Sequence, residues 1–329
     1  MLIPNTGTLE ANLRSGSIDM VSTLGMSFDQ ALAFARRVED SNLSFDVNFR
    51  AGFVYEHLDL DLDEPVLQDP RVRRALVYAI DRERLTEALF EGRQPPALHF
   101  EAPASPWYTD DPEKIVVYEH SRRMAADLLD EAGWTLREDG WRYDKQGNPL
   151  RLTLSTTAGN KMREIVQVYL QDQWRAIGVD TRIQNGPARI FFGQTIRRRL
   201  FDGAAMYAWI QSPELSPRTF VHSTQIPNEA NGWSGQNNPG WARPRVDWLV
   251  EALEAEFDAG KRLDLIHEIL WHYTSEVPVI PLYYRSENSV TPANLTGYRV
   301  TAHQVYATNH VERWSLEQVP AERVGKAGP

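Results

Sequence analysis

The chain has 329 residues, of which 42% are hydrophobic and 10% aromatic, enough for a sizeable core and compatible with two domains. Its formal net charge of −10 argues against general nucleic-acid binding, and the absence of cysteine excludes disulfides, thiol catalysis and zinc–cysteine sites. No apolar run approaches the ~18 residues of a membrane helix, and the first residues lack the basic start and apolar stretch of a signal peptide.

The first 65 residues predict one short helix and two strands. Leu9 and Leu13 face inward on the helix, Gly16 ends it, and residues 18–21 begin a strand. Residues 55–65 predict a strand, because Leu58, Leu60 and Leu62 alternate with Asp59, Asp61 and Asp63. The aspartates are also spaced as in a calcium loop, but the glycine and the later glutamate of such a loop are absent, so we expect no calcium.

Residues 69–92 predict a pair of helices. Asp69 suits the N-cap of the first helix, with Pro70 at its first position, and Asp81 suits the N-cap of the second. Gly92 is suited to a left-handed stop. The first helix carries one apolar stripe, whose members are Val72, Ala75, Leu76, Ala79 and Ile80.

Helices alternate with strands in the rest of the chain, a pattern typical of α/β architecture. The expected helices cover residues 119–133, 161–177, 188–199, 246–257 and 261–275. The expected strands are a hairpin over 141–154 and single strands over 179–183, 201–210 and 277–284. Residues 212–244 are rich in Pro, Asn and Gly, which predicts an irregular segment.

No pattern of residues predicts catalysis. His267 and His272 are one residue too far apart for a zinc-binding helix pair and point about 140° apart. Residues 232–236 lack the last glycine of a nucleophile elbow, and no phosphate-binding glycine loop occurs. His222 alone is a weak metal ligand. We therefore expect no enzyme activity, no cofactor and no bound metal.

The helix pair also resembles a known signature. Residues 69–82 are similar to the D-x-R-V-R-x-A-L-x-x-A-I-D-R pattern of the family 5 extracellular solute-binding proteins, the peptide and nickel receptors of ABC importers. Ten positions are identical in register: Asp69, Arg71, Val72, Arg73, Ala75, Leu76, Ala79, Ile80, Asp81 and Arg82. The similarity continues through LLDEAGW at 128–134, IGVDTRI at 177–183 and VPVIPLYY at 277–284.

This resemblance implies an α/β fold of the periplasmic-binding-protein-like class II, with one complete lobe plus a partial second lobe. We expect residues 1–55 and 285–329 to form the partial first lobe and residues 63–278 to form the second lobe. The hinge strands between them are expected at 56–62 and 279–284. Residues 8–20 match a segment that lies deep inside the family's first lobe, so we expect the preceding part of that lobe to be missing. The uncovered apolar surface would then favour a homodimer.

The function implied by the resemblance is non-catalytic capture of a peptide-like or other small polar solute between two lobes. The captured solute would be delivered to an ABC permease in the membrane, from the periplasm or from outside the cell. Two alternatives stay open: a binding-incompetent receptor fragment or scaffold, and a hydrolase. No nucleic acid is expected among the partners.

The first candidate ligand stretch is the end of the strand predicted over 201–210. Tyr207 and Trp209 alternate to one face, where aromatic rings can stack on a ligand or fill a core. The resemblance puts Trp209 at an aromatic position close to the ligand. Peptide binders of the family follow it with an aspartate for the ligand's ammonium, but this chain has Gln211 and Ser212 there, which suit an uncharged polar group.

The second candidate stretch is residues 226–241, which resemble an I-P-x-x-x-N-G-W-x-G-Q-N loop of some of these receptors. Asn231 offers amide hydrogen bonds and Trp233 offers a stacking surface. The same composition is also typical of a turn-rich loop with a purely structural role.

Overall fold

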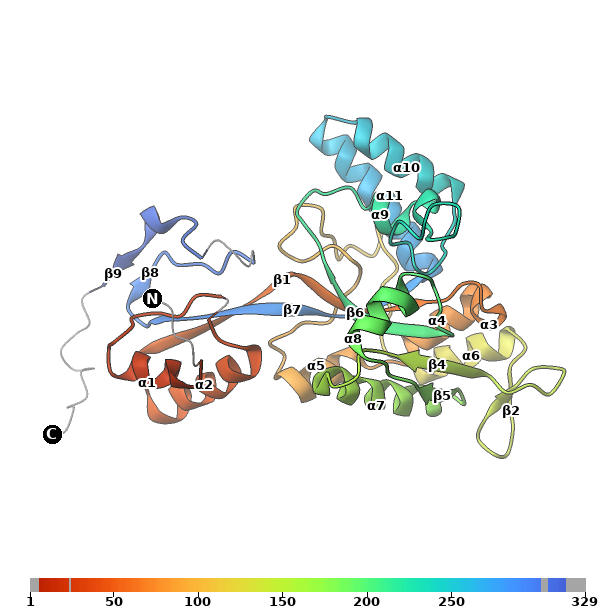
Figure 1. Ribbon diagram of the computed structural model, residues 1–329, viewed down its shortest axis with the longest axis horizontal. Coiled ribbons are helices and arrows are strands. Elements are labelled where there is room, and N and C mark those ends of the chain that lie inside the picture. Colours follow the sequence, from red (N-terminus) through yellow and green to blue (C-terminus); the bar gives the residue numbers. More distant parts are fainter. Residues whose placement is uncertain (1–5, 24, 303–306, 318–329) are drawn as a thin grey trace. The chain divides into compact units, whose positions relative to one another are not determined.

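The computed structural model describes residues 6–23, 25–302 and 307–317, which belong to two compact units (Figure 1). Unit 1 comprises Met1–Phe53 and Arg285–Pro329, and unit 2 comprises Val54–Tyr284. Two long strands, β1 (Phe45–Leu60) and β7 (Val279–Pro292), each contain residues of both units. None of the described helices is both long enough and apolar enough to cross a membrane.

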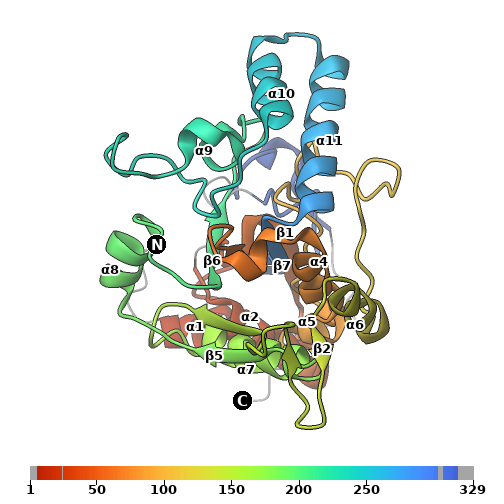
Figure 2. The same ribbon diagram turned by 90° about the vertical axis from the view of Figure 1, so that its right-hand side faces the viewer.

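Unit 2 is built around a mixed sheet with the strand order β5-β4-β6-β1-β7. Strand β4 (Arg151–Ser155) runs parallel to β5 (Asp180–Ile183) and to β6 (Ala204–Ile210), whereas β1 runs antiparallel to β6. Helix α7 (Lys161–Arg175) lies along the β4–β5 side of this sheet (Figures 1 and 2).

Four helices of unit 2 form two packed pairs. Helix α4 (Pro70–Tyr78) packs against α6 (Arg122–Glu131), and α10 (Pro244–Ala255) lies beside α11 (Ala259–Glu276), as Figure 2 shows. The shorter elements are α3 (Pro65–Gln68), α5 (Arg82–Phe90), β2 (Thr135–Leu136), β3 (Arg142–Tyr143), α8 (Ala188–Ile190), η2 (Phe191–Ile196), α9 (Arg218–Val221) and η3 (Ser223–Gln225).

The predicted caps of α4 and α5 are confirmed. The carboxylate of Asp69 accepts a hydrogen bond from the Arg71 backbone N–H at 2.8 Å, and that of Asp81 accepts one from the Arg84 N–H at 2.9 Å. All five members of the predicted stripe on the first helix are at most 1% exposed. At the end of α5, Glu91 already adopts the left-handed conformation, one residue before the predicted Gly92.

Two arginines of the signature are buried and donate hydrogen bonds to backbone carbonyls of neighbouring segments. Arg73 is 2% exposed, and its guanidinium donates to the carbonyl oxygens of Leu67 at 2.6 Å and Glu276 at 2.8 Å. Arg82 donates in the same way to Ala97 at 2.6 Å. Burial lowers the pKa of both arginines to about 10, so they remain charged at neutral pH. These two signature residues therefore link α4 and α5 to neighbouring segments by hydrogen bonds.

Unit 1 contains η1 (Thr6–Thr8), α1 (Leu9–Arg14), α2 (Phe28–Ser41), β8 (Leu295–Thr296), η4 (Val311–Arg313) and β9 (Ser315–Leu316). Its core includes Leu9, Leu13 and Phe34, which pack against Val290 of β7. Helix α2 begins with a capping box, in which Ser27 and Gln30 satisfy each other's backbone N–H groups.

The strand predictions for the first 65 residues need two corrections. The strand expected at 18–21 is only an isolated bridge between Val21 and Val290. The strand expected over 55–65 begins at Phe45 and ends at Leu60, so it is longer and ends earlier. The earlier start has a signal in the sequence, because residues 45–50, FDVNFR, already alternate between apolar and polar side chains.

Two further predictions are wrong in detail. The hairpin expected over 141–154 forms only next to its turn, where Tyr143 bridges Pro149 antiparallel. Beyond the turn, β3 pairs with β2, while β4 joins the main sheet between β5 and β6. The helix expected over 188–199 is a short α-helical turn followed by a π-helix that ends at Ile196. Both errors arise because local patterns do not specify which strand a segment pairs with, or the period of a short helix.

Candidate functional site

One face of strand β6 carries Tyr207 and Trp209, and Gln211 follows directly after the strand. In the antiparallel pairing with β1, Tyr207 lies opposite His57 and Trp209 lies opposite Tyr55. Directly opposed residues of two antiparallel strands point to the same side of the sheet. The two strands therefore present one continuous aromatic surface.

A buried polar network supports this surface from within. Asp59, which is 3% exposed, accepts a hydrogen bond from the Tyr207 hydroxyl and lies 3.3 Å from Nε2 of His57. Asn238 donates from Nδ2 to the Tyr207 hydroxyl at 2.8 Å. Burial raises the pKa of Tyr207, so its hydroxyl stays protonated and can donate. This hydroxyl is thus engaged within the protein.

Aromatic rings fill the space around the network. The Tyr55 ring stacks on His57 with centroids 4.8 Å apart, and His57 meets the Tyr207 ring edge-on at 4.5 Å. The hydroxyls of Tyr55 and Tyr273 lie 3.5 Å apart, and burial raises the pKa of both. The rings thus pack closely against one another on this face of the sheet.

The end of β6 is more accessible than its middle. Trp209 is half-buried, with its ring 5.9 Å from that of Phe220, and Ser212 is exposed. Gln211 is only 6% exposed, yet its side-chain nitrogen has no hydrogen-bond partner among the described residues. A buried donor without an acceptor costs about 1–3 kcal/mol. A ligand acceptor placed beside Trp209 would remove that penalty.

The second candidate stretch behaves differently. Asn231 uses its side chain within its own turn, accepting from the Asn228 N–H at 3.0 Å and donating to the Ile226 carbonyl at 2.9 Å. Trp233 has a φ of +61°, and the Arg198 guanidinium lies 5.7 Å from its ring centroid. In the described chain no ring contact joins Trp233 to Trp209. The structure thus groups Tyr207, Trp209 and Gln211, and the second stretch reaches this group through Asn238 rather than through Asn231 or Trp233.

The buried histidine His222 lies near two carboxylates. Its ring nitrogens are 3.7 Å from Asp247 and 3.5 Å from Glu251. Within residues 6–23, 25–302 and 307–317, however, no group of three histidine or carboxylate side chains is arranged to hold a metal ion.

Sequence reasoning missed several residues of this site. The sequence places Tyr55, His57 and Asp59 in an alternating strand without a site role. Asn238 lies within the second candidate stretch but has no role of its own there, and Phe220 carries no signal. The period of two does put the first three on one face of β1. Their partner strand could not be named from the sequence, so their contact with Tyr207 was not predicted.

Comparisons with known proteins agree with this fold. A sequence model described as bacterial extracellular solute-binding proteins, family 5 Middle, matches residues 1–231. The oligopeptide-binding protein AppA of Bacillus subtilis is 25% identical over 315 residues, which are 96% of this chain and 55% of that protein. The nickel-binding periplasmic protein of Escherichia coli is 26% identical over 224 residues, 68% of this chain and 41% of that protein.

A solved structure is also similar to this chain. The oligopeptide-binding protein of Thermus thermophilus, complexed with a pentapeptide, is 29% identical with a TM-score of 0.72, covering 90% of this chain and 52% of that one. The chain spans about half the length of the curated relatives it matches. Nothing in these matches supports the expected homodimer.

Proposed function

The chain belongs to the family 5 bacterial extracellular solute-binding proteins, and on this premise we propose that it captures a solute for an ABC importer. The family consists of binding proteins rather than enzymes, and its members work outside the cell or in the periplasm. The proposed solute is a peptide or another small polar molecule, received at the end of β6. The proposed partner is an ABC permease in the membrane.

The pairing of Trp209 with Gln211 carries this proposal. Trp209 is half-buried and offers a flat apolar surface. The Gln211 side-chain nitrogen, which has no hydrogen-bond partner among the described residues, offers a donor in a poorly solvated place. No carboxylate stands at 211 or 212, so a free ammonium group would lack a charge partner there. The arrangement favours a carbonyl or another uncharged acceptor of the solute at this position.

We also propose a lobe assignment for the two units. Residues 63–278 would form the second lobe, residues 1–55 and 285–329 part of the first lobe, and residues 56–62 and 279–284 the hinge strands. The division of the chain after Phe53 and before Arg285, within β1 and β7, supports this assignment. Closure of lobes around the solute would present it to the permease.

Trp209→Ala should weaken peptide binding by about 1–3 kcal/mol, because it removes the proposed stacking surface. Isothermal titration of the chain with a panel of short peptides, free and N-acetylated, would measure this loss. Trp248→Ala is the matched control, since Trp248 is 52% exposed on α10 and outside the proposed site. Trp233→Ala tests the second stretch in the same assay.

The outcomes separate the alternatives. Equal affinities of Trp209→Ala and the unchanged chain, with intact folding, would remove Trp209 from the site. Failure of the unchanged chain to bind any peptide or other polar solute would favour the scaffold alternative. Release of cleaved peptide during the titration would favour the hydrolase.

A further inference from the structure

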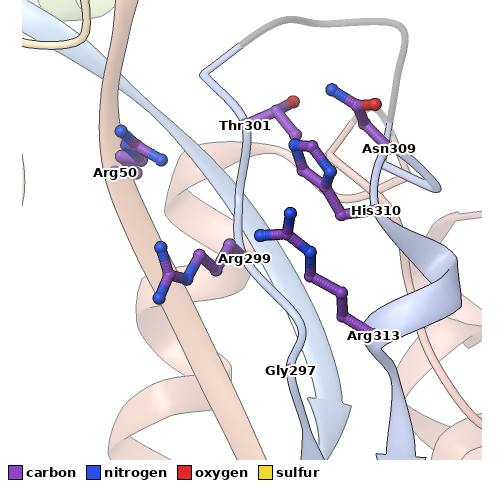
Figure 3. Close-up of a pocket in the computed structure, with 7 residues that line it drawn as sticks. All are labelled: Arg50, Gly297, Arg299, Thr301, Asn309, His310 and Arg313. Carbon is purple, nitrogen blue, oxygen red and sulfur yellow. The ribbon is translucent and has the colours of Figure 1, made fainter.

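Unit 1 contains an electropositive hollow, called here the arginine cavity, with a volume of about 280 Å³. Figure 3 shows the residues that line it: Arg50, Gly297, Arg299, Thr301, Asn309, His310 and Arg313. All of these residues belong to unit 1, and none is a candidate for the proposed solute site on β6. The cavity therefore needs an explanation of its own.

Backbone pairing creates the cavity. Strands β8 and β9 pair antiparallel, with Leu295 opposite Leu316, which brings residues 297–301 alongside residues 309–313. Gly297 has a φ of +77°, and a Cβ atom there would lie 1.9 Å from the carbonyl oxygen of Arg313. Only glycine allows so close an approach of the two segments. The positions of the cationic residues are thus set by the fold.

Strand β1 contributes a further cationic residue, Arg50, to the cavity. Arg50 donates from Nη1 to the carbonyl oxygen of Val300 at 2.8 Å, which fixes its guanidinium at the wall of the cavity. In Figure 3 the side chains of His310 and Arg313 extend into the space between the two paired segments, while Arg299 extends toward β1. Cationic groups thus approach the cavity from three elements.

The cavity holds more positive than negative charge. Glu312 is the one carboxylate within 4 Å of a lining nitrogen among the described residues, 3.6 Å from Nε of Arg313 and 3.5 Å from Nδ1 of His310. Its own side chain is 65% exposed. One exposed carboxylate beside three guanidinium groups leaves the cavity electropositive. Gathering like charges is unfavourable, and a bound anion would relieve it.

We propose that the arginine cavity binds a compact, multivalent oxyanion of the phosphate class. Guanidinium groups are planar forks that match the oxygen atoms of such anions in pairs. Thr301 and Asn309 add a hydroxyl and an amide as neutral donors at the same cavity. A single carboxylate has only two oxygen atoms and would leave most of these donors unused, whereas a phosphoryl group presents several in a tetrahedral array.

Titration calorimetry with inorganic pyrophosphate at low salt tests this proposal on the full chain. We expect saturable binding that Arg313→Gln weakens about tenfold or more, the size of effect typical of one charge-assisted hydrogen-bond pair. Arg299→Gln provides a second variant in case the first perturbs folding, which circular dichroism would reveal. Arg123→Gln is the matched control, because it removes the same charge from an exposed position on α6, with 91% side-chain exposure.

Each result bears directly on the proposal. An unchanged affinity in Arg123→Gln together with a tenfold loss in Arg313→Gln or Arg299→Gln would support it. The absence of saturable pyrophosphate binding by the unchanged chain would overturn it. So would equal losses in the cavity variants and the control, which would indicate non-specific charge attraction. Citrate binding as tightly as pyrophosphate would overturn the assignment to the phosphate class.

Discussion

Arg163→Ala should lower the free energy of unfolding by about 3–5 kcal/mol, because it removes the guanidinium that compensates the buried charge of Glu56. Nε and Nη2 of Arg163 on α7 lie 3.1 Å and 3.2 Å from the two carboxylate oxygens of Glu56 on β1. The Glu56 side chain is 1% exposed and that of Arg163 is 9% exposed. This is the most deeply buried arginine–carboxylate pair among the described residues.

A matched surface pair isolates the contribution of burial. Arg151 and Asp180 join neighbouring strands, with Nε and Oδ2 2.6 Å apart, but the Arg151 side chain is 43% exposed. Arg151→Ala should therefore lower the free energy of unfolding by less than about 1 kcal/mol. Urea denaturation of both variants measures the difference. Equal effects would show that the Glu56 carboxylate gains solvent or another cation when Arg163 is lost.

A double substitution separates pairing from the cost of an uncompensated buried charge. Replacing both partners with apolar residues, Glu56→Leu with Arg163→Met, should recover most of the stability lost in Arg163→Ala, because no buried charge remains. If the double variant is as unstable as Arg163→Ala, the ion pair would stabilise the folded chain more than apolar residues in its place do.

The buried ion pair bears on the solute site through strand β1. Glu56 alternates with Tyr55 and His57, so the ion pair fixes one face of the strand while the aromatic surface forms the other. Loss of Arg163 should then disturb the register between β1 and β6 as well as the global stability. This links the packing of α7 to the geometry around Trp209.

Features set by local sequence were predictable. The caps at Asp69 and Asp81 follow from residue types that satisfy free backbone N–H groups, and the stripe of α4 follows from the helical period. The strand position of Trp209 follows from alternation together with the family resemblance. Each of these depends on residues close together in the chain.

Features that join distant segments were not predictable from one sequence. The burial of Arg73 depends on carbonyl groups more than two hundred residues away, at the end of α11. The network of Asp59 with Tyr207 depends on the register of β1 against β6. That the Gln211 side-chain nitrogen finds no hydrogen-bond partner among the described residues is a property of the packed structure alone. Periodicity identifies the face of an element but not the partner that covers it.

Glu101 should make a contribution to the free energy of unfolding that falls as pH rises from about 4.5 to about 7, against an opposite contribution from His99, whose pKa burial lowers to about 4. Glu101 is 2% exposed, and one of its carboxyl oxygens has no hydrogen-bond partner among the described residues. Burial raises the pKa of this carboxyl to about 7, from an ordinary value of 4.5, although a hydrogen bond with Ser105 lowers it in part. Between these two pH values the folded chain keeps a proton that the unfolded chain has released. The contribution of Glu101 to the free energy of unfolding therefore falls with rising pH, by roughly 3 kcal/mol in full.

Glu101→Gln should remove this pH dependence, because glutamine resembles the protonated carboxyl and does not ionise. We expect the variant to be as stable as the unchanged chain at pH 5 and more stable at pH 8, which urea denaturation at both pH values would measure. Burial also raises the pKa of Asp61, to about 6, and lowers that of His99, to about 4, but both groups are present in both proteins, so the difference between them isolates Glu101. Parallel pH profiles for the two proteins would mean that the Glu101 carboxylate is solvated or paired when it ionises, and that its burial carries no penalty.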